Sequence, residues 1–377
     1  MKYWRGYLVA AIFVACTWGL EKFAESHSAL VDMFYPYVTR MAQNFLSEWS
    51  AGIETCFWQI LLLAFAVLVL ASIVLMIIFK WNPIQWFGWV VAVASIGILL
   101  NTGIYELNKY SGSLAEDIRL QETDYTLSEL ENAAALYRDE ANKLADQIAR
   151  EANGDPVIPA FDVLTEQAAE GFDVLTYERF DSVFAGSVAP VKELSWADLF
   201  TARKITGVMV GLTGEAAINP QVPAVCQPFV ICELMCRRKC IAVDADAMFG
   251  AFLACTENSA PEFRYSGYLM AYKACENALQ AVYDSTGNDA VIRLKSYVNE
   301  NLRHDLQLYE EFFGTEAADS DSEFTRLLAS WHIQKYVLPL MQEEELLFDP
   351  LDETQVDLSG IVNGPQATVP EETEGEE

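Results

Sequence analysis

The chain has 377 residues with a formal net charge of −30, and 52% of its residues are hydrophobic. The five acidic and five basic residues of positions 1–105 cancel, so the whole net charge belongs to the rest of the chain. This acidity excludes nucleic acid as an expected partner, because phosphate binding needs a basic surface. The uneven distribution predicts a membrane domain at 1–105, a folded domain at 106–345 and an acidic, largely disordered tail at 346–377.

Three apolar segments, at about 6–22, 56–79 and 84–101, are long enough to span a bilayer. The first could also be a cleaved signal peptide, but two further spans follow it, so we expect an uncleaved span. Three of the five basic residues of this part flank the spans on one side: Lys2 and Arg5 at the N-terminus, and Lys80 in the turn between the second and third spans. By the positive-inside rule both are cytoplasmic. We therefore expect a multi-pass cell-membrane protein whose residues from about 102 onward are extracytoplasmic.

The segment 23–46, between the first two spans, has apolar residues at intervals of three, four or seven: Phe23, Leu30, Phe34, Val38, Met41 and Phe45. This spacing predicts an amphipathic helix. The helix could lie on the outer membrane surface or pack on the soluble domain. We favour packing on the soluble domain.

The acidic part is predicted to be mostly helical. Thr126 with Glu129 forms a capping box that starts a helix at 128–152. Further amphipathic helices are expected at 161–176, 262–284, 290–313 and 322–347. A short strand-prone segment surrounds 205–210. The expected fold class is α-rich α+β: three N-terminal transmembrane helices, then a mostly helical domain with a small sheet.

The stretch Pro228–Cys255 is rich in cysteine, and Cys232, Cys236 and Cys240 would stack along one helix face. Two explanations are open. The favoured one is structural, with buried thiols or disulfides, which the outside of a cell permits. The alternative is a structural metal site that also uses Cys226.

Three motifs in this region resemble a known family. Thr213–Asn219 reads TGEAAIN, Pro228–Cys232 leads into a helix, and Phe263–Leu269 follows it. Together they resemble an uncharacterised family of bacterial membrane proteins, domain of unknown function 3810, over roughly Tyr3–Asp284. Its members look like membrane-anchored zinc metallopeptidases, with a TGEAN-type strand, an HExxH helix and an EDEAN-type run.

The resemblance implies a zincin-like outer domain in which a strand beside the metal helix binds extended substrate. The segment at 205–210 is the candidate for that strand, although it could equally be purely structural. The same resemblance nominates four substrate-binding residues: Thr213, Gly214, Glu215 and Asn219.

The HExxH residues of the family are absent from this sequence, and the motif can be aligned with it in two ways. Without gaps, HExxH falls on the run 233–237, which reads Glu-Leu-Met-Cys-Arg. With a compensated gap it becomes a CExxC motif, in which Cys232, Cys236 and Asp246 would hold zinc and Glu233 would be the catalytic base. The EDEAN run falls on 244–248 in both alignments.

The missing imidazoles predict a degenerate, metallopeptidase-like pseudoenzyme that binds or scaffolds at the outer membrane surface without catalysis. One alternative is an active membrane-bound metallopeptidase that uses the unusual Cys-Glu-x-x-Cys zinc site. Another is a purely structural membrane protein. The leading hypothesis needs no cofactor, whereas the first alternative needs zinc. The expected partners are the lipid bilayer and a peptide or protein outside the cell.

Overall fold

The computed structural model describes residues 4–314 and 319–339. The chain forms two units, Met1–His332 and Ile333–Glu377. In the second unit the described part contains a π-helical turn, Ile333–Val337. The predicted acidic tail at 346–377 lies outside the described residues. All the other helices and strands of the described chain belong to the first unit.

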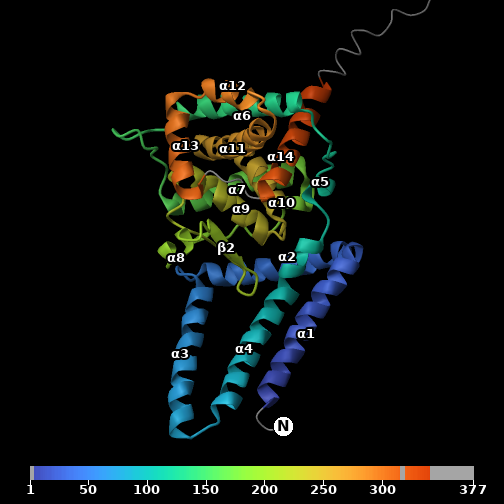
Figure 1. The fold of residues 1–377 in the computed structure, drawn as a ribbon, viewed down its shortest axis with the longest axis vertical. Coiled ribbons are helices and arrows are strands. Elements are labelled where there is room, and N and C mark those ends of the chain that lie inside the picture. The colour runs from blue at the N-terminus through green and yellow to red at the C-terminus, as the bar shows by residue number, and fades with distance from the viewer. Residues whose placement is uncertain (1–3, 315–318, 340–377) are drawn as a thin grey trace, which may run out of the picture. The chain divides into compact units, whose positions relative to one another are not determined.

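Three helices among the described residues are long and apolar enough to cross a membrane: α1 (Arg5–Ser26), α3 (Phe57–Ile78) and α4 (Pro83–Ile104). They correspond to the predicted spans, and Figure 1 shows them extending together from one end of the remaining fold. Asn82 caps α4 by accepting hydrogen bonds from the N–H groups of Ile84 and Gln85. α1 packs closely along α4 because Gly6 and Gly88 let the two backbones touch.

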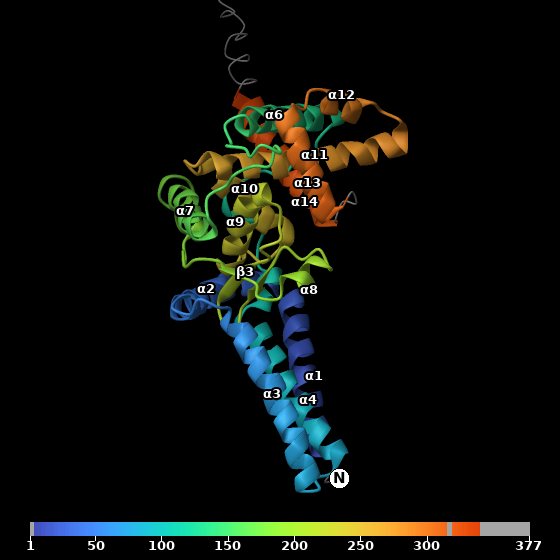
Figure 2. The same cartoon turned by 90° about the vertical axis from the view of Figure 1, so that its left-hand side faces the viewer.

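The predicted amphipathic segment forms α2 (Ser28–Ala51), which begins and ends about five residues later than the expected 23–46. α1 runs on to Ser26, and the chain changes direction at His27. Figures 1 and 2 show α2 lying across the ends of the spanning helices, at the base of the part that we call the globular region, residues 105–332.

The connector after α4 contains a 3₁₀ helix, η2 (Glu106–Tyr110), and a single helical turn, α5 (Leu114–Asp117). α6 (Leu127–Ala145) starts at the predicted capping box, with both Thr126–Glu129 hydrogen bonds formed. It ends before the expected residue 152, because the chain turns back and Arg150 pairs with Pro156. α7 (Phe161–Val174) continues into a π-helical turn at Leu175–Arg179, followed by a 3₁₀ turn at Asp181–Phe184.

The later helices are α8 (Ala197–Thr201), α9 (Gln227–Arg238), α10 (Asp244–Glu257), α11 (Pro261–Thr286), α12 (Ala290–Ser296), α13 (Glu300–Phe313) and α14 (Asp319–His332), and a 3₁₀ turn at Ala224–Cys226 precedes α9. The single helix predicted at 290–313 is wrong, because it is divided between α12 and α13. Asn299 causes the division: its side chain accepts the N–H of Leu302 and so starts a new helix.

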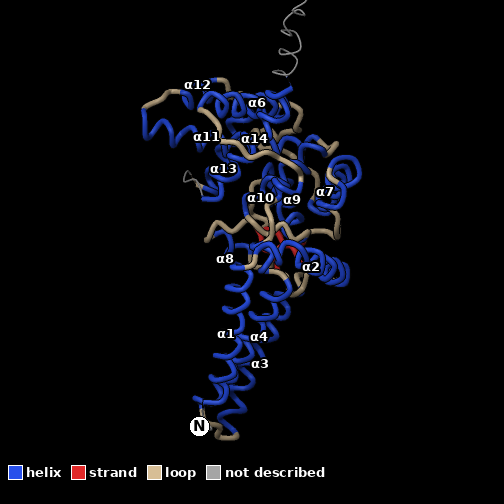
Figure 3. The backbone as a smooth tube through the Cα atoms, turned by 90° about the vertical axis from the view of Figure 1, so that its right-hand side faces the viewer, coloured by secondary structure: helices blue, strands red, loops and turns tan. Residues whose placement is uncertain are grey.

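A small sheet, which is three-stranded within the described residues, lies between α2 and α9 (Figure 3). Its strands are β1 (Lys192–Glu193), β2 (Gly207–Val210) and β3 (Glu215–Ile218), in the order β1-β3-β2. β1 is parallel to β3, and β2 is antiparallel to it, with Val208 opposite Ala217. β2 is the predicted strand at 205–210, and it is an edge strand.

The hydrophobic core lies between the sheet and the layer formed by α6 and α11. α9 and α10 pack against each other in its centre (Figure 2). Four buried aromatic side chains mark this core: Phe229, Phe249, Tyr265 and Tyr272. The helix-rich fold with a small sheet is confirmed.

Candidate functional site

An open cavity of about 700 Å³ lies between the edge strand β2 and helix α9, and we call it the β2 cleft. Gly207 and Met209 of β2 line it on one side, and Glu233 and Arg237 of α9 line it on the other. Asp244, the first residue of α10, lies at its margin, and η2 contributes Glu106 and Lys109. The cleft therefore lies next to the chain that emerges from α4.

Three charged residues in the cleft form one ion-paired cluster. Arg237 Nη2 lies 2.7 Å from Glu233 Oε1, and Arg237 Nη1 lies 2.8 Å from Asp244 Oδ1. Burial opposes the charge on Arg237, but Glu233 and Asp244 outweigh this effect and raise the pKa of the guanidinium above its ordinary value. A permanent cation therefore bridges two carboxylates from consecutive helices.

Local sequence explains why this face of α9 meets the cleft. Glu233 and Arg237 are one helical turn apart, so their side chains lie together. Between them Leu234 packs over Gly207, where an added Cβ would come within 2.7 Å of Leu234 Cδ1. Gly207 thus lets α9 lie directly on β2, and the ion pairs face the space beside that strand.

The outer edge of β2 offers backbone hydrogen-bonding groups to the cleft. Asn219 donates its N–H to the carbonyl of Thr206, so Thr206 and Val208 are in the pairs that bond to β3. In an antiparallel ladder the intervening residues point their N–H and C=O groups the other way. Those residues are Gly207 and Met209, so their backbone groups face the cleft, where the described sheet has no further strand.

The cysteines of the alternative CExxC site lie elsewhere. Cys232 and Cys236 are fully buried against α10. The Cys232 thiol lies next to Cys255, and an added Cβ on Gly250 would come within 2.7 Å of Cys236 Sγ. Burial raises the pKa of both thiols well above its usual range. These two side chains point into the core and away from the cleft.

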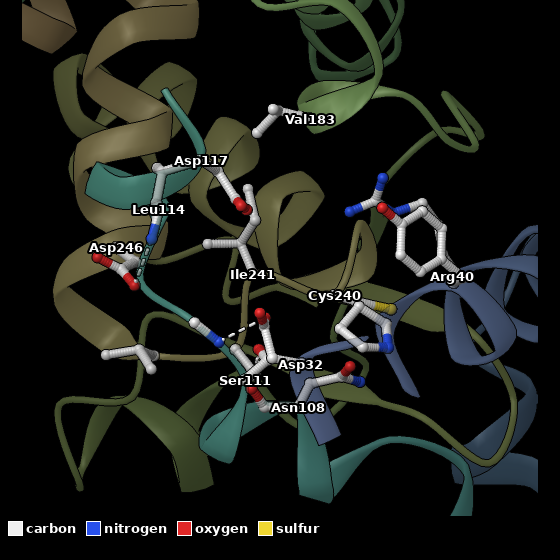
Figure 4. A pocket seen from close by; sticks show the side chains of 15 residues that line it. Asp32, Arg40, Asn108, Ser111, Leu114, Asp117, Val183, Cys240, Ile241 and Asp246 are labelled. Atoms are coloured by element: carbon white, nitrogen blue, oxygen red, sulfur yellow. Dashed lines mark hydrogen bonds between the residues drawn. The ribbon is translucent and has the colours of Figure 1, made fainter. Parts of the chain in front are cut away.

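Asp246, the third residue of that alternative site, does not line the β2 cleft and lies beyond the loop between α9 and α10. It lines a second, smaller cavity of about 140 Å³, where its carboxylate accepts the N–H of Leu114 at 3.1 Å (Figure 4). Within the described residues no three His, Cys, Asp or Glu side chains are grouped as metal ligands. All eight cysteines are free thiols, so the disulfides considered from the sequence are not formed.

Burial raises the pKa of the Asp246 carboxyl to about 6, and the hydrogen bond from Leu114 offsets this only in part. The folded protein therefore holds this proton at pH values where the unfolded chain has lost it, so Asp246 lowers stability as pH rises from about 4 to 6. We expect Asp246→Asn, which keeps an acceptor oxygen, to stabilise the protein by about 3 kcal/mol at pH 7.5 and by less than about 1 kcal/mol at pH 4.

Urea denaturation of the detergent-solubilised protein at both pH values measures this difference. Asp124→Asn removes an exposed carboxylate of the same kind and serves as the control. A gain for Asp246→Asn that is equally large at pH 4 would contradict the assignment.

The four residues nominated for substrate binding belong to β3 and its flanking turns, and none of them lines the β2 cleft. Gly214, in the left-handed conformation (φ 68°), packs against Leu46 and Ser47 of α2, next to the buried Thr213. The Asn219 side chain bonds the hydroxyl of Thr201 and the N–H of Gln221. Glu215 is fully buried and bonds the start of α3. Their role in binding remains a prediction.

The sequence did not identify Arg237 as the centre of the site, because a basic residue in an acidic domain usually forms ion pairs with acids at the surface. The sequence feature that could have revealed the ion pair is the i, i+4 spacing of Arg237 from Glu233. The contributions of Glu106 and Lys109 were also missed, since they belong to a connector far away in sequence. The strand at 205–210 and Glu233 are the two parts of the site that the sequence anticipated, Glu233 in the different role of a catalytic base.

Comparisons with known proteins place the chain in a family. No curated protein and no solved structure matches it. The model of one family, described as "Protein of unknown function (DUF3810)", matches residues 31–328. The match begins within α2 and ends within α14, so it includes the β2 cleft and the whole sheet. The chain therefore belongs to the DUF3810 family, the family that its motifs resemble.

Proposed function

We propose that the protein is a membrane-anchored, non-catalytic relative of zinc metallopeptidases that binds an extended peptide segment in its β2 cleft. The globular region would lie outside the cell, as the basic residues at the N-terminus and at Lys80 favour. The observation that carries the proposal is the position of Arg237, whose guanidinium joins Glu233 to Asp244 beside the open edge of β2.

The ungapped alignment with HExxH supports the loss of catalysis. It puts Glu233 and Arg237 at the positions of the two zinc-binding histidines and Leu234 at the position of the catalytic glutamate. A guanidinium cannot bind zinc, and a leucine cannot activate water. The donor set does not fit a catalytic metal, because Arg237 already neutralises the two carboxylates that could approach one.

The gapped alignment gives less support to a working enzyme. Its two thiols are buried against Cys255 and Gly250, and their raised pKa values keep them protonated. A catalytic zinc site needs thiolates and an open coordination position that water can reach. Neither requirement agrees with side chains that are fully buried.

An exposed strand edge beside a polar groove supports binding. An extended peptide can add to such an edge through main-chain hydrogen bonds, and the groove then selects side chains. Here the outward groups of Gly207 and Met209 would supply the main-chain bonds. The ion-paired cluster and the separate charged side chains of Glu106 and Lys109 would contact the side chains of the peptide.

A selection experiment tests this function on the full-length protein in phospholipid nanodiscs. A displayed library of random linear peptides is panned against it, and the affinities of the enriched peptides are measured by fluorescence anisotropy. Met209→Pro removes an outward N–H of an edge strand, a position where proline is tolerated, and it also removes the methionine side chain, as Met209→Ala does. We expect it to weaken binding at least about tenfold, whereas Met209→Ala, which keeps the N–H, binds much more strongly than the proline variant.

Equal affinity of Met209→Pro and Met209→Ala for the enriched peptides would reject binding by strand addition. Failure to enrich any peptide would reject the proposed function itself. Thermal denaturation of both variants shows whether the fold is retained, and Val208→Pro, which breaks a bond to β3, provides a destabilised reference.

A further inference from the structure

Helix α2 presents a polar face to the globular region, which is the reverse of an ordinary surface helix. Four small or amide side chains of α2 are buried there: Thr39, Gln43, Ser47 and Ser50. Gln43 Nε2 donates to the carbonyl of Gly211 at 3.0 Å, and Thr39 Oγ1 donates to Asn108 Oδ1 at 3.1 Å. Polar contacts therefore attach α2 to the β2–β3 turn and to η2.

Two further polar residues of α2 extend this attachment. Asn44 Oδ1 accepts the N–H of Ser187 at 2.7 Å, and Arg40 Nε donates to the carbonyl of Lys239 at 3.2 Å. The bonds reach segments that are far apart in sequence. They fix the rotation of α2 about its own axis, since all of them come from one side of the helix.

The opposite side of α2 is apolar and exposed. Its large side chains recur every three or four residues: Leu30, Phe34, Val38, Met41, Phe45 and Trp49. Met41 is 74% exposed and Phe45 is 70% exposed. A contiguous exposed stripe of this size marks an interaction surface rather than a surface in contact with water.

This apolar stripe is continuous with the membrane-spanning helices. α2 follows α1 directly after His27 and leads to α3 through a short connection. At that end the ring of Trp49 meets the ring of Phe57, the first residue of α3, edge to face at 5.1 Å. Figures 1 and 3 show α2 at the level where the spanning helices meet the globular region.

We infer that α2 lies flat in one leaflet of the bilayer, with the acyl chains of phospholipids covering the stripe from Leu30 to Trp49. The occupant is lipid because the stripe joins two spanning helices while its polar back is held by the globular region. Insertion is driven by apolar area, since the acidic chain gains nothing from anionic headgroups. This surface is separate from the β2 cleft and does not depend on peptide binding.

Spin labels test this placement in the full-length protein in nanodiscs of phosphatidylcholine. Cys16 is the exposed cysteine and the other seven are buried, so Cys16→Ser gives a background with little native labelling. Met41→Cys and Phe45→Cys report on the stripe, and Tyr177→Cys reports on a side chain that is 82% exposed in the globular region. Collision with oxygen is compared with collision with a water-soluble nickel chelate.

We expect labels at 41 and 45 to collide preferentially with oxygen, at about 5–10 Å below the headgroup boundary, and the label at 177 to collide preferentially with the chelate. Chelate accessibility at 41 equal to that at 177 would overturn the inference. A different outcome would also overturn it: labels at 41 that are protected from both agents and show dipolar broadening between molecules. A second copy of the chain would then cover the stripe.

Discussion

Replacing Glu215 with alanine is expected to cost about 3–5 kcal/mol of folding free energy, the usual range for a broken buried ion pair. The Glu215 carboxylate is fully buried and lies 2.6 Å from the ammonium group of Lys192. It also accepts the N–H groups of Phe57 and Trp58, at 2.8 and 2.9 Å, at the start of α3. Alanine would leave the Lys192 charge without its counter-ion and two helix-terminal N–H groups without their acceptor.

The cost extends beyond one pair because this cluster joins the sheet to the membrane part. Lys192, on β1, also donates to the carbonyls of Ser50 and Thr55 at 2.8 and 3.4 Å, at the end of α2 and in the connection to α3. Glu215, on β3, acts as the side-chain cap of α3. The loss of Glu215 should therefore weaken both the sheet and the start of a spanning helix.

Urea denaturation of the detergent-solubilised protein, followed by circular dichroism, measures the change. Glu193→Ala is the matched control, since Glu193 belongs to the same sheet and has an exposed side chain. We expect the control to change stability by less than about 0.5 kcal/mol. A similar small change for Glu215→Ala would show that the cluster does not hold the sheet to α3.

A second comparison separates the contribution of the Glu215–Lys192 ion pair from that of the helix cap that Glu215 provides for α3. Glu215→Gln keeps an oxygen acceptor but leaves Lys192 charged and buried, so it should be strongly destabilising. Adding Lys192→Met removes that unpaired charge, and the double variant should be more stable than Glu215→Gln alone. If the double variant is less stable than the single one, the contacts of Lys192 with Ser50 and Thr55 outweigh the cost of burying its unpaired charge.

The features predicted correctly from the sequence are those with a strong local cause. The spans follow from uninterrupted apolar length, and the start of α6 follows from the Thr126–Glu129 capping box. Local spacing also predicted that α2 is amphipathic. It did not reveal which face meets the globular region, since that depends on polar partners such as Asn108 and Ser187 from distant segments.

The candidate site was predicted less well, and the reason is physical. By sequence alone, Glu215 and Asn219 resemble the substrate-binding positions of the family. In the structure, however, Glu215 bonds the start of α3, and Asn219 bonds Thr201 and the turn after β3. The cysteine spacing suggested a functional face, but the same spacing suits a face that packs on Gly250. Whether a helix face is buried depends on tertiary contacts, which spacing alone cannot specify.

Rebuilding the zinc ligands at the ungapped positions is expected to produce tight zinc binding, with a Kd below about 1 μM. The variant carries four substitutions: Glu233→His, Leu234→Glu, Arg237→His and Asp244→Glu. The three ligand positions already converge, since Arg237 lies within hydrogen-bonding distance of both Glu233 and Asp244. Removing the guanidinium frees the space that it occupies, and glutamate at 244 reaches further than aspartate.

The matched control places the histidines at the gapped positions, as Cys232→His with Cys236→His. Both side chains are fully buried against α10, where a larger imidazole would collide with Cys255 and with the backbone at Gly250. We expect this pair to destabilise the protein by about 1–3 kcal/mol through overpacking and to bind no zinc. Isothermal titration with zinc and denaturation curves measure the two effects on both variants.

The comparison decides which alignment describes the architecture of the chain. Zinc binding by the four-substitution variant alone would mean that the β2 cleft keeps the geometry of a metallopeptidase site with an arginine in place of the metal. Zinc binding by the control alone would favour the gapped alignment, with the site at Cys232 and Cys236, and would remove the main support for the proposed function. If neither variant binds zinc while both remain folded, the proposed likeness to metallopeptidases would find no support in the ligand geometry. The ion-paired cluster would then be explained as a purely structural link between α9 and α10.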